Sequence, residues 1–257
     1  RQQQAGNFQN QIFQMIEGEK LGSFWGYTFA GVWQEDDVNA PFVDANGQTN
    51  GKTNGEVYKV KPGNSKYVDV NKDGVYNDAD QGIIGCGQPT FNWGWNNTFN
   101  YKNFDFSFFV VGFHGFDIYN ATHQMGYNLI KSQQMAGVTP MRELLNRWTP
   151  TNTNTDIPGF VKGGTENKDF FSTRFVENGS FIKMKSITLG YTLPEATCRS
   201  LGINNLRVYA SVQNPFHITK YSGLDPEATM GSPLVQGVDW GAYPNSRNYL
   251  IGLNFSF

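Results

Sequence analysis

The chain has 257 residues, of which 16% are charged and 15% aromatic, and its formal net charge is -2. That balance lacks the basic footprint of a nucleic-acid-binding protein, so nucleic acid is not an expected partner. The sequence has no apolar run of about 18 residues and so no candidate membrane-spanning helix, whereas a transmembrane β-strand needs only alternation and is compatible with a mean hydropathy of -0.48.

The first predicted strand lies at residues 22–33, with the sequence GSFWGYTFAGVW. Aromatic side chains recur at alternate positions through most of this stretch, which is typical of a strand with one apolar face. A long link rich in Gly, Asn and Thr follows, over about residues 35–89. The alternating residues of the predicted strand are Trp25, Tyr27, Phe29 and Trp33.

Within this link, residues 69–80 read DVNKDGVYNDAD and match the start of the calcium-loop pattern D-x-[DN]-x-[DN]-G. Ca²⁺ needs about six or seven oxygen ligands to replace its water shell, and closely spaced Asp and Asn supply them. An Asn- and Asp-rich turn that hydrogen-bonds to itself and binds no metal is the alternative, because no second EF-hand helix is expected after the loop. The predicted ligands are Asp69, Asn71, Asp73, Val75 through its carbonyl, Asn77 and Asp80.

The aromatic stretch at residues 91–113 predicts a β-hairpin. Lys102 and Asn103 separate its arms and can form a two-residue turn, in which Asn tolerates a positive φ. The aromatic face of the first arm is a candidate platform for sugar stacking, but a lipid-facing strand explains it better. The alternating residues are Phe91, Trp93, Trp95, Phe99 and Tyr101 on the first arm, and Phe104, Phe106, Phe108 and Val110 on the second.

Three further strands are predicted towards the carboxy terminus, at residues 181–193, 205–214 and 247–257. Each alternates apolar residues with small or polar ones, so each has one apolar face. The apolar residues are Ile187, Leu189, Tyr191 and Leu193 in the first strand, Leu206, Val208, Ala210 and Val212 in the second, and Tyr249, Ile251, Leu253, Phe255 and Phe257 in the third.

The links between the predicted strands alternate strictly between long and short. This pattern is typical of an antiparallel up-and-down transmembrane β-barrel, which has long extracellular loops at one end and short periplasmic turns at the other. The long links are at about residues 35–89, 115–176 and 219–245, and the short ones are at 102–103 and 194–204, where a helical turn is expected after Pro194.

The two cysteines fall in links of different length, Cys86 in a long one and Cys198 in a short one. They are therefore expected at opposite ends of strands that cross a membrane core of about 25 Å. Because a disulfide needs Cα atoms within about 7 Å of each other, we predict two free thiols.

Six strands are too few to close a transmembrane barrel, whose smallest bacterial examples have about eight. We therefore expect residues 1–257 to be the carboxy-terminal part of a larger barrel, with the earlier strands supplied elsewhere. The amino-terminal RQQQAGNFQNQIF has no signal-peptide character, which also indicates a piece of a longer protein.

Seven ordered stretches, spread over most of the chain, resemble the carboxy-terminal portion of the SusC/RagA-like TonB-dependent outer-membrane transporters. The stretches are GSFWGYTFAGVWQ, YVDVNKDGVYNDADQGIIG, FNWGWNNTFNYKNFDFSFFVVGFHGFDIYN, LLNRWTPTNTNTDIPG, FIKMKSITLGYTLP, LRVYASVQNPFHITKYSGLDPE and GAYPNSRNYLIGLNFSF.

This resemblance implies a barrel of about 22 strands with a plugged lumen in the outer membrane of a Gram-negative bacterium, with extracellular loops and a periplasmic carboxy terminus. It implies import of glycans or oligopeptides together with a SusD-like surface lipoprotein, with energy from the TonB complex. The plug domain and the TonB box precede the strands in this family and have no counterpart in these residues. Outer-membrane lipid is the remaining expected partner, and no catalytic activity is expected.

A second interpretation is a soluble extracellular carbohydrate-binding β-sandwich with a structural calcium. It explains the aromatic residues and the Asp-rich loop equally well. The two interpretations differ in the apolar strand faces, which a sandwich buries between two sheets and a transmembrane barrel exposes to lipid.

Overall fold

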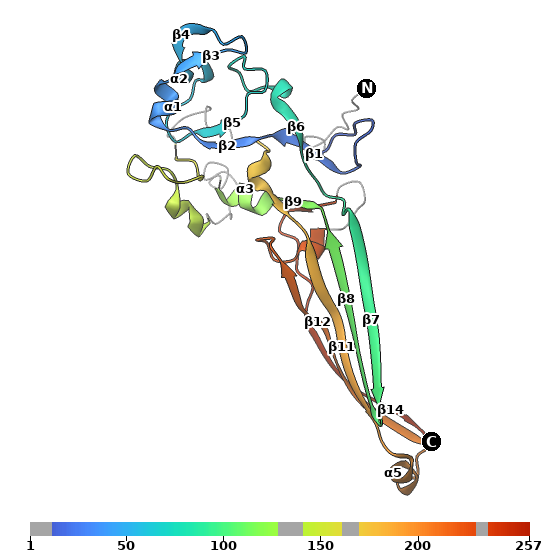
Figure 1. Cartoon of the computed structure of the whole chain (residues 1–257). Helices are drawn as coiled ribbons and strands as arrows, with labels where there is room; N and C mark the ends of the chain where they lie inside the picture. The colour runs from blue at the N-terminus through green and yellow to red at the C-terminus, as the bar shows by residue number, and fades with distance from the viewer. Residues whose placement is uncertain (1–11, 128–140, 161–169, 230–235) are drawn as a thin grey trace.

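The computed structural model describes all residues except 1–11, 128–140, 161–169 and 230–235, and the last three of these ranges fall within predicted long links. A long antiparallel sheet carries a group of shorter elements at one end, called the loop end below (Figure 1). The sheet consists of β7 (Phe91–Tyr101), β8 (Phe104–His114), β11 (Phe181–Thr192), β12 (Asn205–Thr219) and β14 (Asn248–Ser256).

The strands of the sheet lie in the order β14-β12-β11-β8-β7, and every neighbouring pair is antiparallel. This up-and-down arrangement confirms the hairpin and the three carboxy-terminal strands predicted from alternation. The helical turn expected after Pro194 is α5 (Glu195–Ser200). In the β7–β8 turn, however, Lys102 rather than Asn103 adopts the positive φ, at 53°, and the Asn103 side chain donates a hydrogen bond to the Thr192 carbonyl at 2.7 Å.

The two faces of the sheet differ in polarity because successive side chains of a strand point to opposite sides. The register places Phe99, Phe106, Leu189, Ala210 and Ile251 in one row, so a single apolar stripe crosses all five strands. The opposite face carries mainly small and polar side chains, including Asn96, Thr98, Asn100, Ser107, Thr188, Ser211, Asn254 and Ser256.

The apolar face of the sheet is exposed. Ile251 is 83% exposed, Tyr249 75% and Leu253 61%, and in the described part of the chain no second sheet packs on them. This exposure contradicts the β-sandwich interpretation, which requires the face to be buried. The aromatic residues of β7 belong to the same face, as expected for a strand that contacts lipid.

The loop end is built from short strands and helices around two small apolar clusters, one containing Phe24 and Tyr119 and the other Phe116 and Phe181. In the described residues no helix is long and apolar enough to cross a membrane. The elements are β1 (Ser23–Tyr27), β2 (Phe29–Val32), α1 (Glu35–Asn39), β3 (Pro41–Val43), β4 (Thr49–Thr53), α2 (Asn54–Tyr58), β5 (Ser65–Tyr67), β6 (Gln81–Cys86), β9 (Asp117–Asn120), α3 (Ala121–Tyr127), β10 (Val176–Asn178), β13 (Val238–Asp239) and the 3-10 helices η2 (Asp78–Asp80), η3 (Arg142–Asn146), η4 (Thr173–Phe175) and η5 (Pro226–Thr229).

The predicted strand at residues 22–33 does not belong to the long sheet, which has five strands in the described residues. The segment breaks at Thr28 into β1, which pairs with β6, and β2, which pairs with β5. Phe24 is 0% and Trp33 3% exposed, so side chains from both faces of this segment pack inside the loop end. Alternation alone does not distinguish these buried aromatics from lipid-facing ones.

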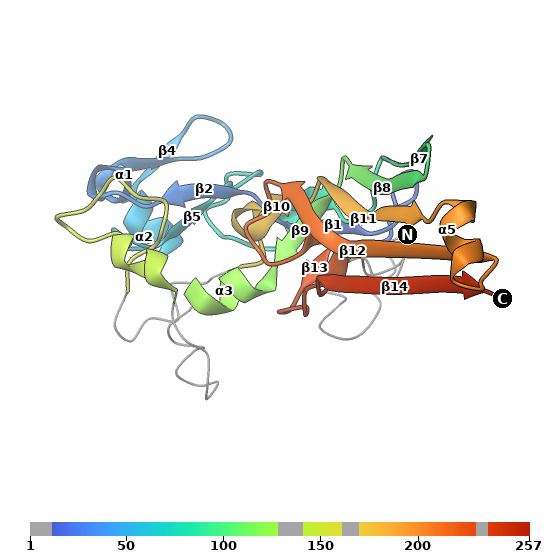
Figure 2. The ribbon, with the colours of Figure 1, turned by 90° about the horizontal axis from the view of Figure 1, so that it is seen from below.

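The position of β1 and β2 also changes the expected pattern of links. The alternation of short and long links starts at the β7–β8 turn, because residues 35–89 do not join two strands of the long sheet. The shorter elements α1, α2 and β4 extend away from the sheet to one side (Figures 1 and 2).

Both cysteines are free thiols, as predicted. Cys86 is the last residue of β6 at the loop end, and Cys198 lies in α5 at the other end of the long sheet (Figure 1). The length of the strands therefore separates the two sulfur atoms.

Candidate functional site

The predicted calcium loop, residues 69–80, lies between β5 and β6 at the loop end. Its sixth residue, Gly74, has a φ of 82°, and a Cβ atom at this position would lie 2.2 Å from Cγ1 of Val57. Both the backbone conformation and the close packing therefore require glycine. The last residues of the loop form η2, which Asn77 caps by accepting a hydrogen bond from the Ala79 amide at 2.8 Å.

Backbone amides of the loop point at its own side-chain oxygens. The Gly74 amide donates to Oδ2 of Asp69 at 2.8 Å. The Asp73 amide donates to Oδ1 of Asn71 at 3.1 Å, and the Val75 amide donates to Oδ1 of Asp73 at 2.8 Å. The bond from Val75 is the main reason why the pKa of Asp73 lies below its usual range. The first half of the loop is thus closed by hydrogen bonds to its own side chains.

The second half of the loop is tied down by Asp80, which is 2% exposed. Its two oxygens accept hydrogen bonds from the amides of Val70 and Asn77, both at 2.9 Å. The structure therefore brings the predicted residues at both ends of the loop together, with Asp80 facing inwards.

One oxygen of the loop has no partner of its own. Oδ1 of Asp69 is buried and, in the described structure, accepts no hydrogen bond, an arrangement that costs free energy unless another group pairs with it. Among the described residues, no three His, Cys, Asp or Glu side chains form a metal-binding group by themselves. A cation that pairs with Asp69 would therefore also need amide or carbonyl oxygens, such as those of Asn71, Asn77 and Val75.

Two stacked tyrosines, Tyr58 and Tyr76, pack next to Asp69 of the loop. The Tyr58 hydroxyl donates to Oδ2 of Asp69 at 2.9 Å, and its ring stacks on Tyr76 with 5.2 Å between centroids. Burial raises the pKa of Tyr76 to about 12 and also raises the pKa of Tyr58. Both hydroxyls are therefore protonated at neutral pH, and Tyr58 acts as a neutral donor to the Asp69 carboxylate.

The polar face of the sheet carries one ion pair near the end opposite the loops. Arg207 donates to both carboxylate oxygens of Asp105, with Nε and Oδ1 2.9 Å apart. Gly190 lies between these two side chains, since a Cβ atom there would be 2.4 Å from Oδ1 of Asp105 and 2.6 Å from Nη2 of Arg207. A larger residue at position 190 would therefore collide with the ion pair, and glycine leaves room for it.

A second charged group joins this face to the loop end. Lys183 of β11 is 2% exposed, and its Nζ lies 2.9 Å from Oδ2 of Asp225 and 2.7 Å from Oε2 of Glu227. Lys185 pairs with the other oxygen of Glu227. The Asn245 side chain donates to both carboxylates, at 3.1 and 3.0 Å. Three polar side chains from the β12–β14 link thus surround one buried ammonium of the strand.

The Lys183 cluster is absent from the sequence-based predictions. The available signal was the pair Lys183 and Lys185 in FIKMKSITLG, which interrupts a strand of otherwise apolar, small and hydroxyl side chains. The carboxylates that pair with it are more than forty residues further along the chain, and nothing in the sequence pattern connects them.

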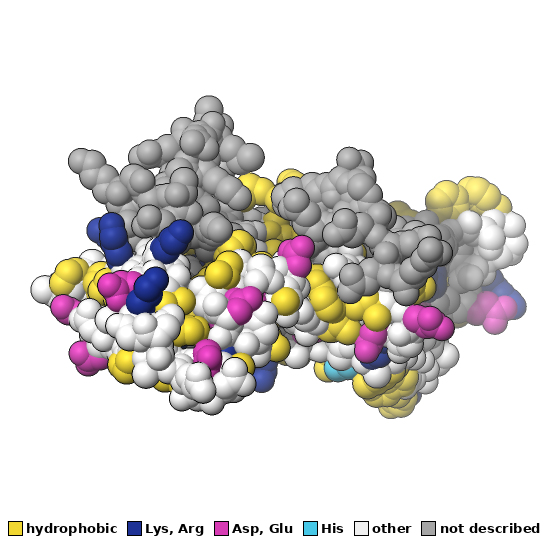
Figure 3. Space-filling view, turned by 90° about the horizontal axis from the view of Figure 1, so that it is seen from above, with side chains coloured by type: hydrophobic (Ala, Val, Ile, Leu, Met, Phe, Trp, Pro, Cys, Tyr) yellow, Lys and Arg dark blue, Asp and Glu magenta, His cyan; other side chains and the backbone are white. Residues whose placement is uncertain are grey.

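These features together define a class of protein. A sheet with an exposed apolar face, a polar opposite face and long connections at one end is the wall of an outer-membrane-type β-barrel. The five described strands form part of such a wall and do not close it. At the loop end, acidic, basic and apolar side chains lie close together on the described surface (Figure 3).

Comparison with known proteins narrows this class. No protein-family model matches the chain. The chain is 34% identical to TonB-dependent receptor P3 of Formosa agariphila over 259 residues, which cover 98% of the chain and 24% of that receptor. It is 32% identical to TonB-dependent receptor SusC of Bacteroides thetaiotaomicron over 199 residues, which cover 77% of the chain and 18% of SusC.

Solved structures share the fold. A structure of the RagAB peptide importer in an open-open state matches 91% of the chain and 22% of the solved chain, with a TM-score of 0.65 and 22% identity. The closed-closed state of RagAB gives a TM-score of 0.64 and 24% identity. The chain spans about a quarter of the length of the receptors that it matches. Over that span, the chain is a homologue of the TonB-dependent receptors, SusC among them, and it shares the fold of the RagAB structures.

Proposed function

We propose that this chain is part of an outer-membrane transporter that imports glycans or oligopeptides with energy from the TonB complex. A SusD-like surface lipoprotein captures the substrate in this proposal. The observation that carries it is the apolar stripe from Phe99 to Ile251, which crosses all five strands while the opposite face stays polar. Such a sheet is suited to separating lipid from a wet lumen.

The proposal is tested in cells that produce the full-length protein with an affinity tag. We expect the protein in the outer-membrane fraction, extracted only by detergent, and recovered together with a surface lipoprotein. Uptake of labelled oligosaccharides or peptides should stop when the protein or TonB is deleted. Recovery without detergent, or uptake that survives both deletions, would contradict the proposal.

We also propose that the loop end faces outside and α5 faces the periplasm. Cysteine labelling of intact cells tests this orientation in a Cys86→Ser background. Val70 is 65% and Leu201 60% exposed, and they lie at opposite ends of the sheet. A membrane-impermeant maleimide should label Val70→Cys in intact cells and Leu201→Cys only after the membrane is permeabilised. The reverse pattern would invert the orientation.

A second proposal concerns residues 69–80, which we infer hold a structural Ca²⁺. The support is the buried Oδ1 of Asp69 without a partner, next to a loop that already presents Asn71 and Asp73 oxygens. A cation there would offset the desolvation of the carboxylate and stiffen the loop. The chain's own contribution is to hold these oxygens in place through the Gly74 and Val75 amides.

Terbium luminescence tests the calcium proposal on the full-length protein. Tyr58 lies 2.9 Å from Asp69, so excitation of tyrosine should sensitise a bound Tb³⁺, and Ca²⁺ should displace it. Asp69→Asn should abolish the signal. Asp44→Asn is the matched control, because Asp44 forms a similar turn outside the loop by accepting from the amides of Asn46 and Gln48. Equal signals from both variants would support the self-bonded turn instead.

A further inference from the structure

The loop end contains a pocket of about 270 Å³, called the α3 pocket below. Four segments form it: α3, η3, the segment at Asp156 and Ile157, and η4. α3 lies on the lower side of the loop end in Figure 1, towards the long strands. The polar side chains that line the pocket are His123, Tyr127, Glu143, Asn146, Asp156 and Arg174.

The α3 pocket offers hydrogen-bonding groups that the protein itself leaves unused. Glu143 and Asp156 are exposed, and among the described residues neither carboxylate forms an ion pair or accepts a hydrogen bond. Oδ1 of Asn146 accepts from the Asn152 side chain at 3.1 Å, which leaves the NH₂ group of Asn146 to donate. Both acceptors and a donor are therefore open to a ligand.

Arg174 brings a positive charge to the same pocket. Its guanidinium lies 5.1 Å from the ring centroids of both Tyr127 and Phe175, which is a cation–π arrangement. Burial is the main reason why the pKa of Tyr127 lies above its usual value, and Glu143 and Asp156 raise this pKa further, whereas Arg174 lowers it. Charges of both signs therefore act on one hydroxyl group of the pocket.

This mixed lining matches a neutral ring with several hydroxyl groups. Sugar hydroxyls donate to carboxylates and accept from an amide or a guanidinium, and hydrogen bonds to charged groups are the stronger kind. An aromatic side chain would remove water from Glu143 and Asp156 without replacing it, which is costly. A second cation would find the ring faces beside Arg174 already occupied, and an anion would be repelled by the two carboxylates.

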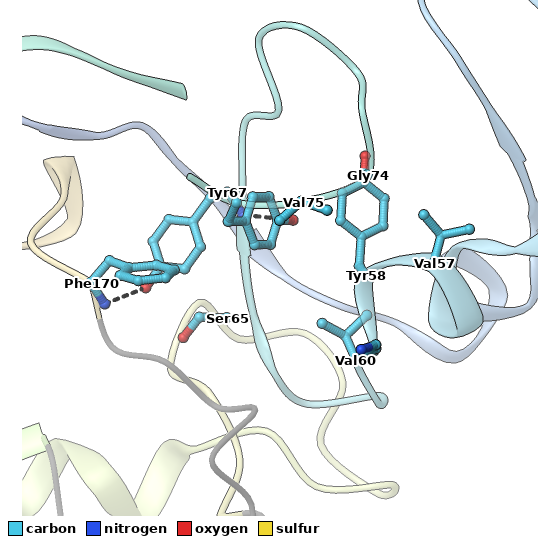
Figure 4. Close-up of a pocket in the computed structure, with 10 residues that line it drawn as sticks. Val57, Tyr58, Val60, Ser65, Tyr67, Gly74, Val75 and Phe170 are labelled. Atoms are coloured by element: carbon cyan, nitrogen blue, oxygen red, sulfur yellow. Dashed lines mark hydrogen bonds between the residues drawn. The ribbon is translucent and has the colours of Figure 1, made fainter. Parts of the chain in front are cut away.

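The pocket behind the 69–80 loop does not offer the same chemistry (Figure 4). It has a volume of about 370 Å³, and its described lining includes Lys59 and Ser65 but no carboxylate. Its rings already pack on one another, with 5.2 Å between the centroids of Tyr67 and Phe170. The two open carboxylates therefore distinguish the α3 pocket as the site for a polyhydroxylated ligand.

We propose that the α3 pocket binds one neutral hexopyranose ring of a glycan. Glu143 and Asp156 accept hydrogen bonds from its hydroxyl groups, and Arg174 and Asn146 donate to them. The volume lies just below the range of about 300–1,000 Å³ for ligand sites, which suits a single ring. The inference rests on the proposed import function and narrows its substrate to glycans, but binding itself does not require import.

Saturation-transfer NMR on the full-length protein tests the site, in a detergent without a sugar headgroup. The probes are the methyl glycosides of glucose, galactose and mannose, and at least one should receive saturation from the wild-type protein. Glu143→Gln and Asp156→Asn should each weaken its binding about tenfold, because a neutral amide accepts more weakly than a carboxylate. Glu195→Gln is the matched control and should leave binding unchanged, since Glu195 lies in α5 at the other end of the long sheet.

All three substituted residues are exposed, so the variants should fold. The proposal is overturned if none of the three glycosides binds, or if Glu143→Gln and Asp156→Asn bind as tightly as Glu195→Gln. Displacement of the glycoside by Nα-acetyl-lysinamide also overturns it, because the carboxylates would then form a cation site. A protein that imports peptides but binds no glycoside contradicts this inference alone, whereas one that binds a glycoside at the α3 pocket without importing it contradicts only the transport proposal.

Discussion

At the scale of single residues, Lys183 is a charged side chain that is buried in the described chain. Its ammonium is almost fully buried between Asp225 and Glu227, and removing one charge from such a group leaves the others without compensation. The cluster also connects two kinds of structure, because Lys183 belongs to a long strand and its partners to the β12–β14 link.

Lys183→Met should therefore destabilise the protein, by about 3–5 kcal/mol, and should release the β12–β14 link. The measurement is unfolding of the full-length protein in detergent, together with limited proteolysis near Asp225. In the combined variant Lys183→Met/Asp225→Asn/Glu227→Gln, most of the loss should be recovered because no buried charge remains unpaired, and Lys185, which loses Glu227, is partly exposed to solvent. A single variant as stable as wild type would show that the ammonium is not buried in this way.

The same cluster predicts sensitivity to acid. Burial acts to raise the pKa of Asp225, but hydrogen bonds from Lys183 and the Asn245 amide outweigh it, and the pKa lies below its usual range. A depressed folded-state pKa means that the stabilisation is complete above the unfolded-state value, about 3.9, and is lost as the pH falls through the folded-state value. Proteolysis of the link should therefore accelerate only in that acidic range. Asp225→Asn should remove this pH dependence.

At the scale of elements, the strands were predictable where one face is apolar and the other is mainly polar. In β7, β8, β11, β12 and β14, apolar residues on one face alternate with mainly polar or small residues on the other. This difference can be read from consecutive residues of each strand. The segment at residues 22–33 has similar alternation, but its first part, β1, is buried on both sides, so only its tertiary neighbours distinguish it.

In the candidate site, too, local contacts were predictable from the sequence and long-range contacts were not. The turn chemistry of residues 69–80 was visible because Asp, Asn and Gly act on backbone groups only a few positions away. The packing around Tyr67 was not, because the Phe170 amide donates to the Tyr67 hydroxyl across 103 positions of sequence. Contacts of that range leave no periodic trace. Whether the loop holds calcium remains a prediction.

Strand β11 offers a test of how neighbouring strands fit together. Gly190 makes room for the Asp105–Arg207 pair, whose side chains are 24% and 27% exposed. Gly190→Ala should separate the two and cost about 0.5–1 kcal/mol, the range of a partly exposed pair. In an Asp105→Ala/Arg207→Ala background the same change should be neutral or stabilising, because alanine suits a strand better than glycine. A cost that is equal in both backgrounds, measured by unfolding in detergent, would refute this account.

At the scale of the whole molecule, the two faces of the sheet have different surroundings. Its apolar side remains exposed while its polar side receives the Lys183 cluster and the link that covers it. The loop end, by contrast, has its own apolar clusters and resembles a small globular unit. The chain therefore combines a sheet that leaves its apolar side chains exposed with a loop end that buries its own.

This asymmetry predicts opposite responses at neighbouring positions of β14. Ile251 is on the apolar face and Leu250 on the other, paired with Ser211. Ile251→Lys should cost about 2–4 kcal/mol in a bilayer if it lies near the midplane, whereas Leu250→Lys should cost under about 1 kcal/mol. Urea unfolding of the full-length protein in lipid vesicles measures both. Equal costs would mean that the face does not meet lipid.

The order of the strands has a consequence for assembly. β7 and β14 are the outermost strands of the sheet, and in the described residues each leaves one row of backbone amides and carbonyls without a ladder partner. Hydrocarbon offers no hydrogen-bonding partners for these backbone groups. We therefore expect the five strands to be stable in lipid only when other strands pair with both edges.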